Sequence, residues 1–268
     1  MTEDIEFSII MPALNEEKDI ESAIFESLKA IDHFGISGEI IVINDGSTDR
    51  TEALIKSYGE RDTRVRLITH DRPMGVGASF WDGVDQARGK FVVMLPGDNE
   101  NDPVEIFRYH SLLKNVDIVI PFVFNKHVRS VFRNVLSFIY RFIINTTFLV
   151  NFNYTNGTVL YRKTVLDELE FRSSSFFFQT DILVRTVKRG YLFAEVPYRL
   201  DLRSQGVSKA VSFPSLYRVT RGYLRLVRDI HWSPPKKPPQ TFVAGSQTAK
   251  RYQEWKDRNA SNLKDLAP

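Results

Sequence analysis

The sequence predicts an α/β fold with a mostly parallel sheet and helices on both faces. Over the first 125 residues, short apolar runs alternate with amphipathic segments, the pattern of strands and helices in turn. The run at 91–95 is wholly apolar, as expected of a strand buried on both faces of a parallel sheet. Polar or glycine-containing loops follow several of these runs, and ligands bind at that edge of such sheets.

Length and composition further limit the number of domains and the classes of function. A chain of 268 residues with 43% hydrophobic residues can form one large α/β domain or two small ones. A net charge of +3 is no general polyanion-binding signature, and no nucleic-acid-binding motif is found, so we expect no nucleic-acid partner. The lack of cysteine excludes disulfides, thiolate catalysis and Cys-ligated zinc, and fits a reducing compartment.

The elements of the first half follow from hydrophobic periodicity. Apolar residues at helical spacing define the first helix, which two glycines end, and the same reasoning applies to each later helix. Strands are expected at 6–11, 39–43, 65–69, 91–95 and 117–123. Helices are expected at 18–33, about 49–58, 75–89 and 103–113.

The second half has a different pattern. Strands are expected at 158–161 and 191–196, and helices at 128–150, 180–189, 213–230 and 247–258. The proline-rich SPPKKPPQ run after residue 232 is incompatible with regular structure. We therefore expect one folded unit over 1–232, then a linker and tail over 233–268.

One loop concentrates acidic side chains. The apolar run at 91–95 ends at Pro96-Gly97, and five polar residues follow it: Asp98, Asn99, Glu100, Asn101 and Asp102. Such oxygen ligands bind hard cations, Mg²⁺ or Mn²⁺, which in turn bind phosphates. Taken alone, the stretch fits a polar turn before a helix equally well.

Two other loops have residues suited to a nucleotide. Asp45 is placed to accept hydrogen bonds from a base or ribose, although an Asx turn would also explain it. Gly75 and Gly77 would let the backbone approach a phosphate beside the free N–H groups of the next helix, and a tight turn is the simpler explanation.

A basic segment lies in the second half. Arg203, Ser208 and Lys209 place two cations and a hydroxyl around Gly206. This set suits a diphosphate leaving group, and it also fits a solvated basic loop.

Two helices are candidates for a membrane surface. The 128–150 segment is rich in Phe and Ile and carries Arg129 and Arg133. The 213–230 segment carries arginines on one helical face, at positions Arg218, Arg221, Arg225 and Arg228. A basic amphipathic helix can lie on anionic lipid, and a core-packed helix with a solvated basic face has the same pattern. No uncharged apolar stretch reaches about 18 residues, so no helix is expected to span a bilayer.

The ordered motifs resemble those of the inverting family 2 glycosyltransferases, which use nucleotide-sugar donors on the Rossmann-like GT-A fold. The segments that carry this similarity are PALNE at 12–16, IVINDGSTD at 41–49 and MGVGA at 74–78. The similarity covers about residues 5 to 230.

Within that family the chain is most similar to the polyprenyl-phosphate glycosyltransferases, the dolichol-phosphate mannose synthase group. NYTNGTVLYRK at 153–163, DILVRTVKRGYLFAEVPY at 181–198 and the run from Arg203 through GVSK carry this closer similarity. The resemblance implies sugar transfer to a polyprenyl phosphate at the cytoplasmic face of a membrane, by a peripheral protein.

The resemblance also implies roles for individual residues. The nucleotide-sugar donor would be bound by Pro12, Ala13, Asn15, Glu16, Asn44, Asp45, Gly75, Gly77, Gly97, Asp98, Arg203, Ser208 and Lys209. Catalysis would rest on Asp98, Arg203 and Lys209, and the metal would be held by Asp98 and Glu100. The acceptor phosphate would be bound by Arg129, Arg133, Asn156 and Gln179.

The chain departs from the family at two places. The family's Asp-x-Asp becomes Pro96-Gly97-Asp98, and we infer that Glu100 restores the lost charge. The position of the family's catalytic base is Gln179. A phosphate monoester, with a second pKa of about 6, is already ionised near neutrality and needs no base. The lost base therefore agrees with a phosphate acceptor.

Two alternatives stay open at this point. One is a family 2 enzyme that uses a sugar hydroxyl as acceptor, with Asp181 as base. The other is a non-enzymatic sugar-nucleotide-binding partner of a membrane protein.

Overall fold

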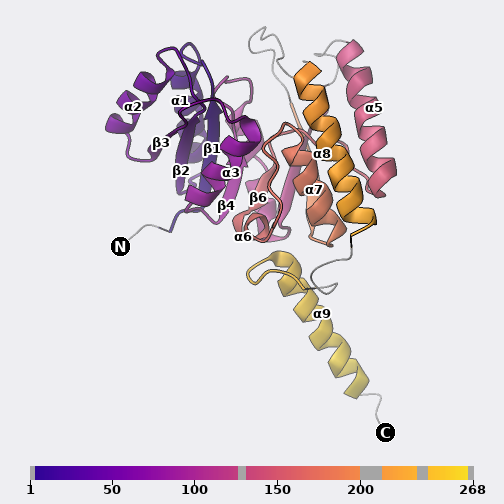
Figure 1. Cartoon of the computed structure of the whole chain (residues 1–268). Coiled ribbons are helices and arrows are strands. Elements are labelled where there is room, and N and C mark those ends of the chain that lie inside the picture. The colour runs from indigo at the N-terminus through magenta and orange to yellow at the C-terminus, as the bar shows by residue number, and fades with distance from the viewer. Residues whose placement is uncertain (1–3, 126–130, 200–212, 234–240, 265–268) are drawn as a thin grey trace.

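A seven-stranded sheet runs through the centre of the molecule, in the order β3-β2-β1-β4-β6-β5-β7 (Figure 1). The computed structural model describes residues 4–125, 131–199, 213–233 and 241–264. The strands are β1 Phe7–Ala13, β2 Gly38–Asn44, β3 Val65–Thr69, β4 Phe91–Met94, β5 Ile118–Val123, β6 Leu160–Arg162 and β7 Phe193–Tyr198. β6 runs antiparallel to both β4 and β5, and the other pairs are parallel.

Helices cover both faces of this sheet. One face packs against α1 Ile20–His33, α2 Thr51–Arg61, α4 Pro103–Phe107 and the 3-10 helix η1 His110–Lys114. The other packs against α3 Val76–Gln86, α5 Val131–Phe148, α6 Lys163–Asp167, α7 Phe178–Lys188 and α8 Phe213–His231. The predicted α/β architecture with a mostly parallel sheet is therefore confirmed.

The apolar runs form strands because both of their faces are buried. In β2, Ile40 and Val42 point into the core under α1, while Ile41 and Ile43 point into the core under α3. Successive side chains of a strand alternate between faces, so a central strand must be apolar at every position.

Several expected elements need correction. The helix expected at 103–113 is two short ones, α4 and η1. The break follows from His110, whose ring Nδ1 donates to the Phe107 carbonyl oxygen at 2.8 Å and takes the place of a helical N–H. β1 continues through Ala13, so Pro12 and Ala13 end a strand and do not belong to the following loop.

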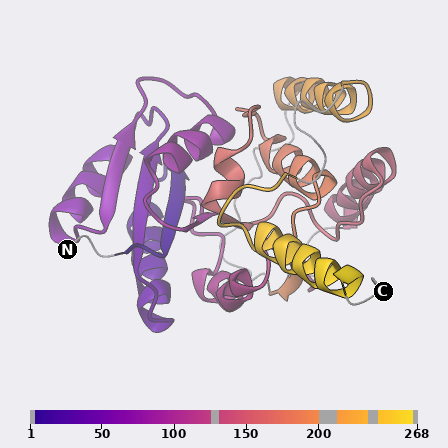
Figure 2. The same ribbon diagram turned by 90° about the horizontal axis from the view of Figure 1, so that it is seen from below.

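The C-terminal segment packs on the body of the protein. Thr248, at the start of α9 (Gln247–Lys264), donates its hydroxyl to the Asp117 carboxylate and its backbone N–H to the same group at 2.9 Å. Phe242 stacks edge-on against Tyr191. Beyond this anchor α9 projects from the molecule (Figures 1 and 2). The tail is thus attached to the body of the protein, and the domain division at 232 stays a prediction.

Candidate functional site

The loops with the predicted site residues meet at one edge of the sheet. The carboxyl ends of β1, β2 and β4 share this edge because the three strands are parallel neighbours. The register Val93↔Leu160 brings the start of β6 beside the end of β4. Residues 156–158, which precede β6, therefore lie at the same edge as the acidic loop after β4. Ligands bind at this edge in open α/β sheets.

Hydrogen bonds tie the loop after β1 to the loop after β2. Asn15, with a positive φ of 58°, accepts from the Thr48 backbone N–H at 2.8 Å through its side-chain oxygen. The Asn15 N–H donates to Ser47 Oγ at 3.0 Å, and the Glu16 N–H donates to Thr51 Oγ1 at 2.8 Å. The two loops therefore form one preorganised surface, on which Asn15 has a structural role besides any contact with a donor.

Asp45 holds a third loop in place. Its carboxylate accepts from the backbone N–H groups of Met74 at 2.7 Å and Gly75 at 2.9 Å, and lies 2.8 Å from His70 Nδ1. His70 Nε2 lies 3.0 Å from Asp82 Oδ2. Asp45 is thus buried and largely committed to the loop at 70–75, through tertiary hydrogen bonds and not through a local Asx turn. A nucleoside would compete for its remaining lone pair.

Asn44 is also committed to the protein. Its amide nitrogen donates to Glu52 at 3.1 Å, and its oxygen accepts from the Ser47 N–H at 3.1 Å. These bonds shape the loop after β2, and the donor contact of Asn44 stays a prediction.

The two glycines at the start of α3, the N-cap Gly75 and the helical Gly77, differ in surroundings. Gly75 has a φ of 95°, which an L side chain rarely adopts. A Cβ at Gly77 would lie 2.5 Å from the Ser173 carbonyl oxygen, so the space beside Gly77 is filled by the 173–174 backbone. Gly77 therefore allows close packing between loops, and its predicted contact with the donor stays a prediction.

The acidic loop is fixed against β1. The Gly97 N–H donates to the Pro12 carbonyl at 3.0 Å, and a Cβ at Gly97 would lie 2.8 Å from Ile20. Asp98 accepts from the Glu100 N–H at 3.1 Å, in an Asx turn, and Asn99 has a positive φ of 52°. Asp102 accepts from the Val104 N–H and caps α4.

The chemistry of this loop fits a divalent cation. Asp98 and Glu100 supply carboxylate oxygens two residues apart, and the buried side-chain oxygen of Asn99 has no hydrogen-bond partner. Within the described ranges, no group of three or more His, Cys, Asp or Glu forms a metal cluster. Mg²⁺ is commonly held by one or two carboxylates together with substrate phosphates, so this donor set suits a cation that arrives with a diphosphate.

Two of the predicted acceptor residues lie together. Gln179 is buried in the first turn of α7, and the next residue, Thr180, donates its hydroxyl to the side-chain oxygen of Asn156 at 3.1 Å. Tyr140 of α5 lies 2.8 Å from the same hydroxyl. Burial raises the pKa of Tyr140 to about 12, so its phenol keeps its proton. Thr180 and Tyr140 were not predicted, because only the fold brings them to Asn156.

Asp181, the alternative base, faces another direction. Its carboxylate pairs with Arg185 at 2.9 Å, and Arg185 pairs in turn with Asp229 of α8 at 2.8 Å. Burial raises the pKa of Asp181 above its usual range, although the Arg185 hydrogen bond opposes this. This carboxylate belongs to the contact between α7 and α8.

Other predicted residues lie outside the described residues. Arg129, Arg203, Ser208 and Lys209 fall in the ranges 126–130 and 200–212, and the side chain of Arg133 is not described. Their roles stay predictions. His70 was missed by the sequence analysis, although its place directly after β3 is the signal that strand ends provide.

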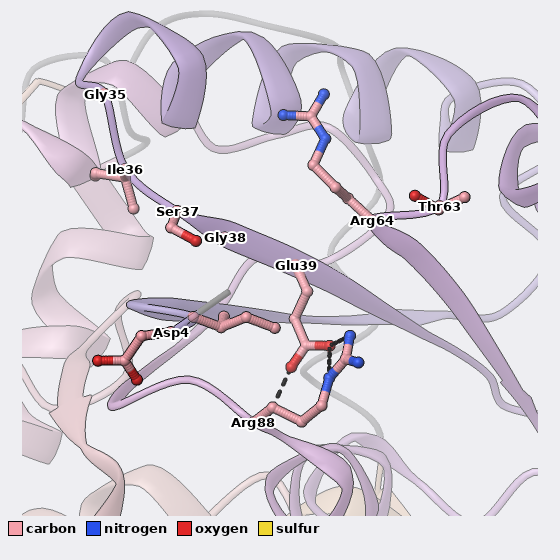
Figure 3. Close-up of a pocket in the computed structure, with 10 residues that line it drawn as sticks. Asp4, Gly35, Ile36, Ser37, Gly38, Glu39, Thr63, Arg64 and Arg88 are labelled. Atoms are coloured by element: carbon pink, nitrogen blue, oxygen red, sulfur yellow. Dashed lines mark hydrogen bonds and ion pairs between the residues drawn. The ribbon is translucent and has the colours of Figure 1, made fainter. Parts of the chain in front are cut away.

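A pocket at the opposite edge of the sheet is a structural ion-pair site (Figure 3). It has a volume of about 1130 Å³ and is lined by Asp4, Glu39, Arg64 and Arg88 among others. Burial disfavours ionisation of Glu39, but hydrogen bonds from Arg88, Ser8 and Arg66 outweigh it and lower the pKa of this carboxyl. Each of these charges already has an ion-pair partner: Glu39 pairs with Arg88, Asp4 with Lys90, and Arg64 with Asp62 and Asp32. The carboxyl edge therefore remains the candidate site.

Beside the carboxyl edge, α5 and α8 form an exposed surface. From residue 134 onward, where its side chains are described, α5 leaves six large apolar side chains exposed, which we call its apolar face: Val135, Leu136, Phe138, Ile139, Phe142 and Ile143. α8 packs beside it through Tyr223, whose hydroxyl lies 2.8 Å from Thr147 Oγ1, and exposes its arginine stripe. None of the helices in the described segments has the length and apolarity needed to cross a bilayer.

Comparison with known proteins identifies the family. The model of the family "Glycosyl transferase family 2" matches residues 8–170, more than half of the chain. The chain belongs to glycosyl transferase family 2. The match covers β1 to β6 and so includes the loops described above, except the segment around α7.

Similar curated proteins act on polyprenyl phosphates by name. Dodecaprenyl-phosphate galacturonate synthase of Rhizobium johnstonii is 24% identical over 76% of this chain and 62% of its own length. Dolichyl-phosphate β-glucosyltransferase of Trichomonas vaginalis is 35% identical over 34% of this chain and 29% of its own. The undecaprenyl-phosphate 4-deoxy-4-formamido-L-arabinose transferase of Pseudomonas aeruginosa is 33% identical over 38% and 30%. The chain thus spans less than two thirds of these relatives.

Solved structures confirm the fold. Glucosyl-3-phosphoglycerate synthase from Mycobacterium tuberculosis, in complex with UDP, superposes with a TM-score of 0.64 at 20% identity, over 87% of this chain and 82% of that one. Its complex with Mn²⁺, UDP and phosphoglyceric acid gives a TM-score of 0.63 at 19% identity, over 87% and 80%. The predicted GT-A-like fold is thereby confirmed.

Proposed function

We propose that this chain transfers a sugar from a nucleotide diphosphate sugar to a polyprenyl phosphate and inverts the anomeric carbon. The observation that carries the proposal is the position of the acidic loop. Asp98 and Glu100 lie at the carboxyl edge with Asn156, which is linked through Thr180 to Tyr140 of α5, the helix that exposes the apolar face. Membership of family 2 and the names of the similar curated proteins support sugar transfer to such a lipid.

Asp98 and Glu100 would hold Mg²⁺ or Mn²⁺ against the donor diphosphate. The cation would supply positive charge that stabilises the departing nucleoside diphosphate. The similar synthase has been crystallised with Mn²⁺ or Mg²⁺ and UDP, which supports a divalent metal here. Arg203, Ser208 and Lys209 are proposed to bind the same leaving group.

The proposed reaction needs no general base. An oxygen of the acceptor phosphate forms the new bond to the anomeric carbon, and the bond from that carbon to the donor diphosphate breaks. A phosphate monoester is largely ionised near neutrality, so no proton has to leave the nucleophile. This agrees with Gln179 at the base position and with Asp181 paired to Arg185. Acceptor binding is proposed for Arg129, Arg133, Asn156 and Gln179.

The lipid acceptor requires access to a membrane, and α5 with α8 supplies it. The apolar face of α5 would enter the interface, while Arg218, Arg221, Arg225 and Arg228 of α8 face the lipid headgroups. We propose peripheral association with an anionic membrane surface. Co-purification from membranes would test whether a membrane-protein partner takes part in this association.

A turnover assay tests the proposal. The purified chain is incubated with a panel of GDP- and UDP-sugars, Mn²⁺ or Mg²⁺, and a short-chain polyprenyl phosphate in detergent. We expect a chelator-sensitive glycosyl phosphoryl lipid from one donor. Donor binding without lipid product under either metal would overturn the proposal. The panel includes 3-phosphoglycerate and free sugars as hydroxyl acceptors, since product from these would favour a hydroxyl-acceptor enzyme.

A further inference from the structure

The helix α5 has two functional sides. Residues of an α-helix follow one another at about 100°, so positions 135, 138, 139, 142 and 143 share one side. This side is the apolar face, and Phe142 is 61% exposed at its centre. Tyr140 borders this face on one side, and Arg141 and Asn145 border it on the other; we call these three residues together the polar flank. Ile144 and Phe148, fully buried, fix the helix to the body.

The polar flank binds the loop that precedes β6. We call residues 152–157 the acceptor loop because they contain Asn156. Asn145 makes two hydrogen bonds to the backbone of Phe152, one from its amide nitrogen at 3.0 Å and one to its oxygen at 3.1 Å. Arg141 donates to the Asn153 carbonyl at 3.0 Å, and its guanidinium lies 5.7 Å from the centre of the exposed Phe138 ring. Arg141 thus touches both the apolar face and the acceptor loop.

Tyr140 extends this link to the site. Its hydroxyl lies 2.8 Å from Thr180 Oγ1, and Thr180 donates to Asn156 at 3.1 Å. On the far side of the loop, Asn153 is anchored to Glu195 of β7 by two hydrogen bonds of 2.6 and 2.8 Å. The acceptor loop is therefore held between the sheet and α5, so a change in α5 acts on Asn156.

We infer that Tyr140, Arg141 and Asn145 are positioning residues through which membrane contact orders the acceptor loop. A helix of 18 residues that leaves a broad apolar face in water is incompletely packed, and tertiary burial supplies most of a helix's stability. Contact of that face with a bilayer buries it, and the hydrogen bonds of the polar flank pass the added order to residues 152–157. The protein thereby binds its acceptor phosphate best when it lies on the membrane that contains the lipid. This inference rests on the proposed function.

The test compares two matched variants, each of which removes one hydroxyl group that takes part in a contact of α5. Tyr140→Phe removes the hydroxyl that reaches Thr180, and Tyr223→Phe removes the hydroxyl that reaches Thr147 at the same distance of 2.8 Å but leaves the acceptor loop untouched. Hydrogen–deuterium exchange of the 150–157 amides is measured with and without anionic phospholipid vesicles. Turnover of a water-soluble short-chain prenyl phosphate is measured under the same two conditions.

We expect vesicles to slow exchange at 150–157 about fivefold or more in the wild type and in Tyr223→Phe, and much less in Tyr140→Phe. Loss of one hydrogen bond, about 1 kcal/mol, should raise the acceptor KM of Tyr140→Phe about fivefold on vesicles and leave the donor KM unchanged. Asn145→Ala, which removes two bonds, should show a larger effect. Thermal unfolding of each variant checks that it is folded.

The inference would be overturned if the wild type and all variants showed equal amide exchange and equal acceptor KM on vesicles. It would also be overturned if vesicles left the amide exchange of the acceptor loop unchanged in the wild type. Failure of the proposed function would look different. The wild type would then form no glycosyl phosphoryl product from any donor, while the exchange experiment would still report whether α5 orders residues 152–157.

Discussion

The proposed donor side and the proposed membrane side of the candidate site are built in opposite ways. On the donor side, the loops after β1, β2 and β3 are held by hydrogen bonds among Asn15, Asp45 and their neighbours, and Met74 is the one large apolar side chain of these loops that is strongly exposed. On the membrane side, α5 exposes an apolar face and α8 exposes arginines. A water-soluble nucleotide sugar can use a site that is complete in solution, whereas a lipid acceptor calls for a surface that is completed by the bilayer. Variants on the donor side should therefore lose turnover, and variants on the membrane side should lose binding to vesicles.

The largest effect is expected at the acidic loop. Asp98→Asn removes a proposed metal ligand, and turnover should fall about 100-fold or more because charge on the leaving group is no longer stabilised. Asp102→Asn is the matched control, since asparagine also caps α4 and turnover should stay near wild type. Rates at saturating Mn²⁺, together with circular dichroism, separate chemistry from folding. A fully active Asp98→Asn would remove Asp98 from the metal site.

A smaller and more selective effect is expected on the apolar face of α5. Phe142→Glu should weaken binding to vesicles about tenfold, because a charge replaces the aromatic ring that the bilayer would bury. Turnover of a water-soluble acceptor in solution should change little. Phe25→Glu, at a side chain 54% exposed on α1, is the control. If both variants bind vesicles like the wild type in a flotation assay, α5 is not the membrane surface.

The arginine stripe of α8 (Arg218, Arg221, Arg225 and Arg228) should contribute less to vesicle binding per residue than Phe142 does. Arg221→Ala should weaken binding to anionic vesicles about fivefold, since one basic side chain near such a surface contributes about 1 kcal/mol. The difference from wild type should shrink at high salt through screening. Lys29→Ala on α1, on the other face of the sheet, should have no effect. Equal losses for the two variants would indicate a non-specific charge effect.

The smallest effect on turnover is expected at Glu39, at the opposite edge. Burial disfavours its charge, yet hydrogen bonds from Arg88, Ser8 and Arg66 lower its pKa in the folded state. Its charge therefore stabilises the fold above the usual glutamate pKa of about 4.3, and this stabilisation is lost as pH falls through the lowered value. Glu39→Gln should lower the free energy of unfolding at pH 7, with a difference that narrows in acid. Denaturant unfolding at several pH values checks this, and a difference independent of pH would contradict it.

The sequence was most informative where local pattern decides structure. β3 was predicted at its observed bounds, and β1, β2 and β4 lie within two residues of their predicted ends, because buried parallel strands are apolar throughout. The family motifs also gave the loops that meet at the carboxyl edge. Asp98 and Glu100 were predicted on one loop and lie there.

The side-chain contacts that could not be predicted from the sequence join segments that lie far apart along the chain. Asp117 accepts hydrogen bonds from Gln247 and Thr248, 130 residues later, and no local pattern indicates that pairing. The commitment of Asn44 and Asp45 to neighbouring loops depends on side-chain direction, which spacing alone does not give. The link from Tyr140 through Thr180 to Asn156 joins three segments and needs the folded chain.

The measurement that tests the central claim most directly compares two acceptors that differ in one group. The wild-type protein receives a nucleotide sugar, a divalent metal, and either a polyprenyl phosphate or the polyprenol with the same chain, on anionic vesicles. We predict that only the phosphate is glycosylated, that chelation abolishes the product, and that the linkage is inverted relative to the donor. Transfer to the polyprenol at a similar rate, or to a soluble sugar hydroxyl in preference to the phosphate, would contradict the account.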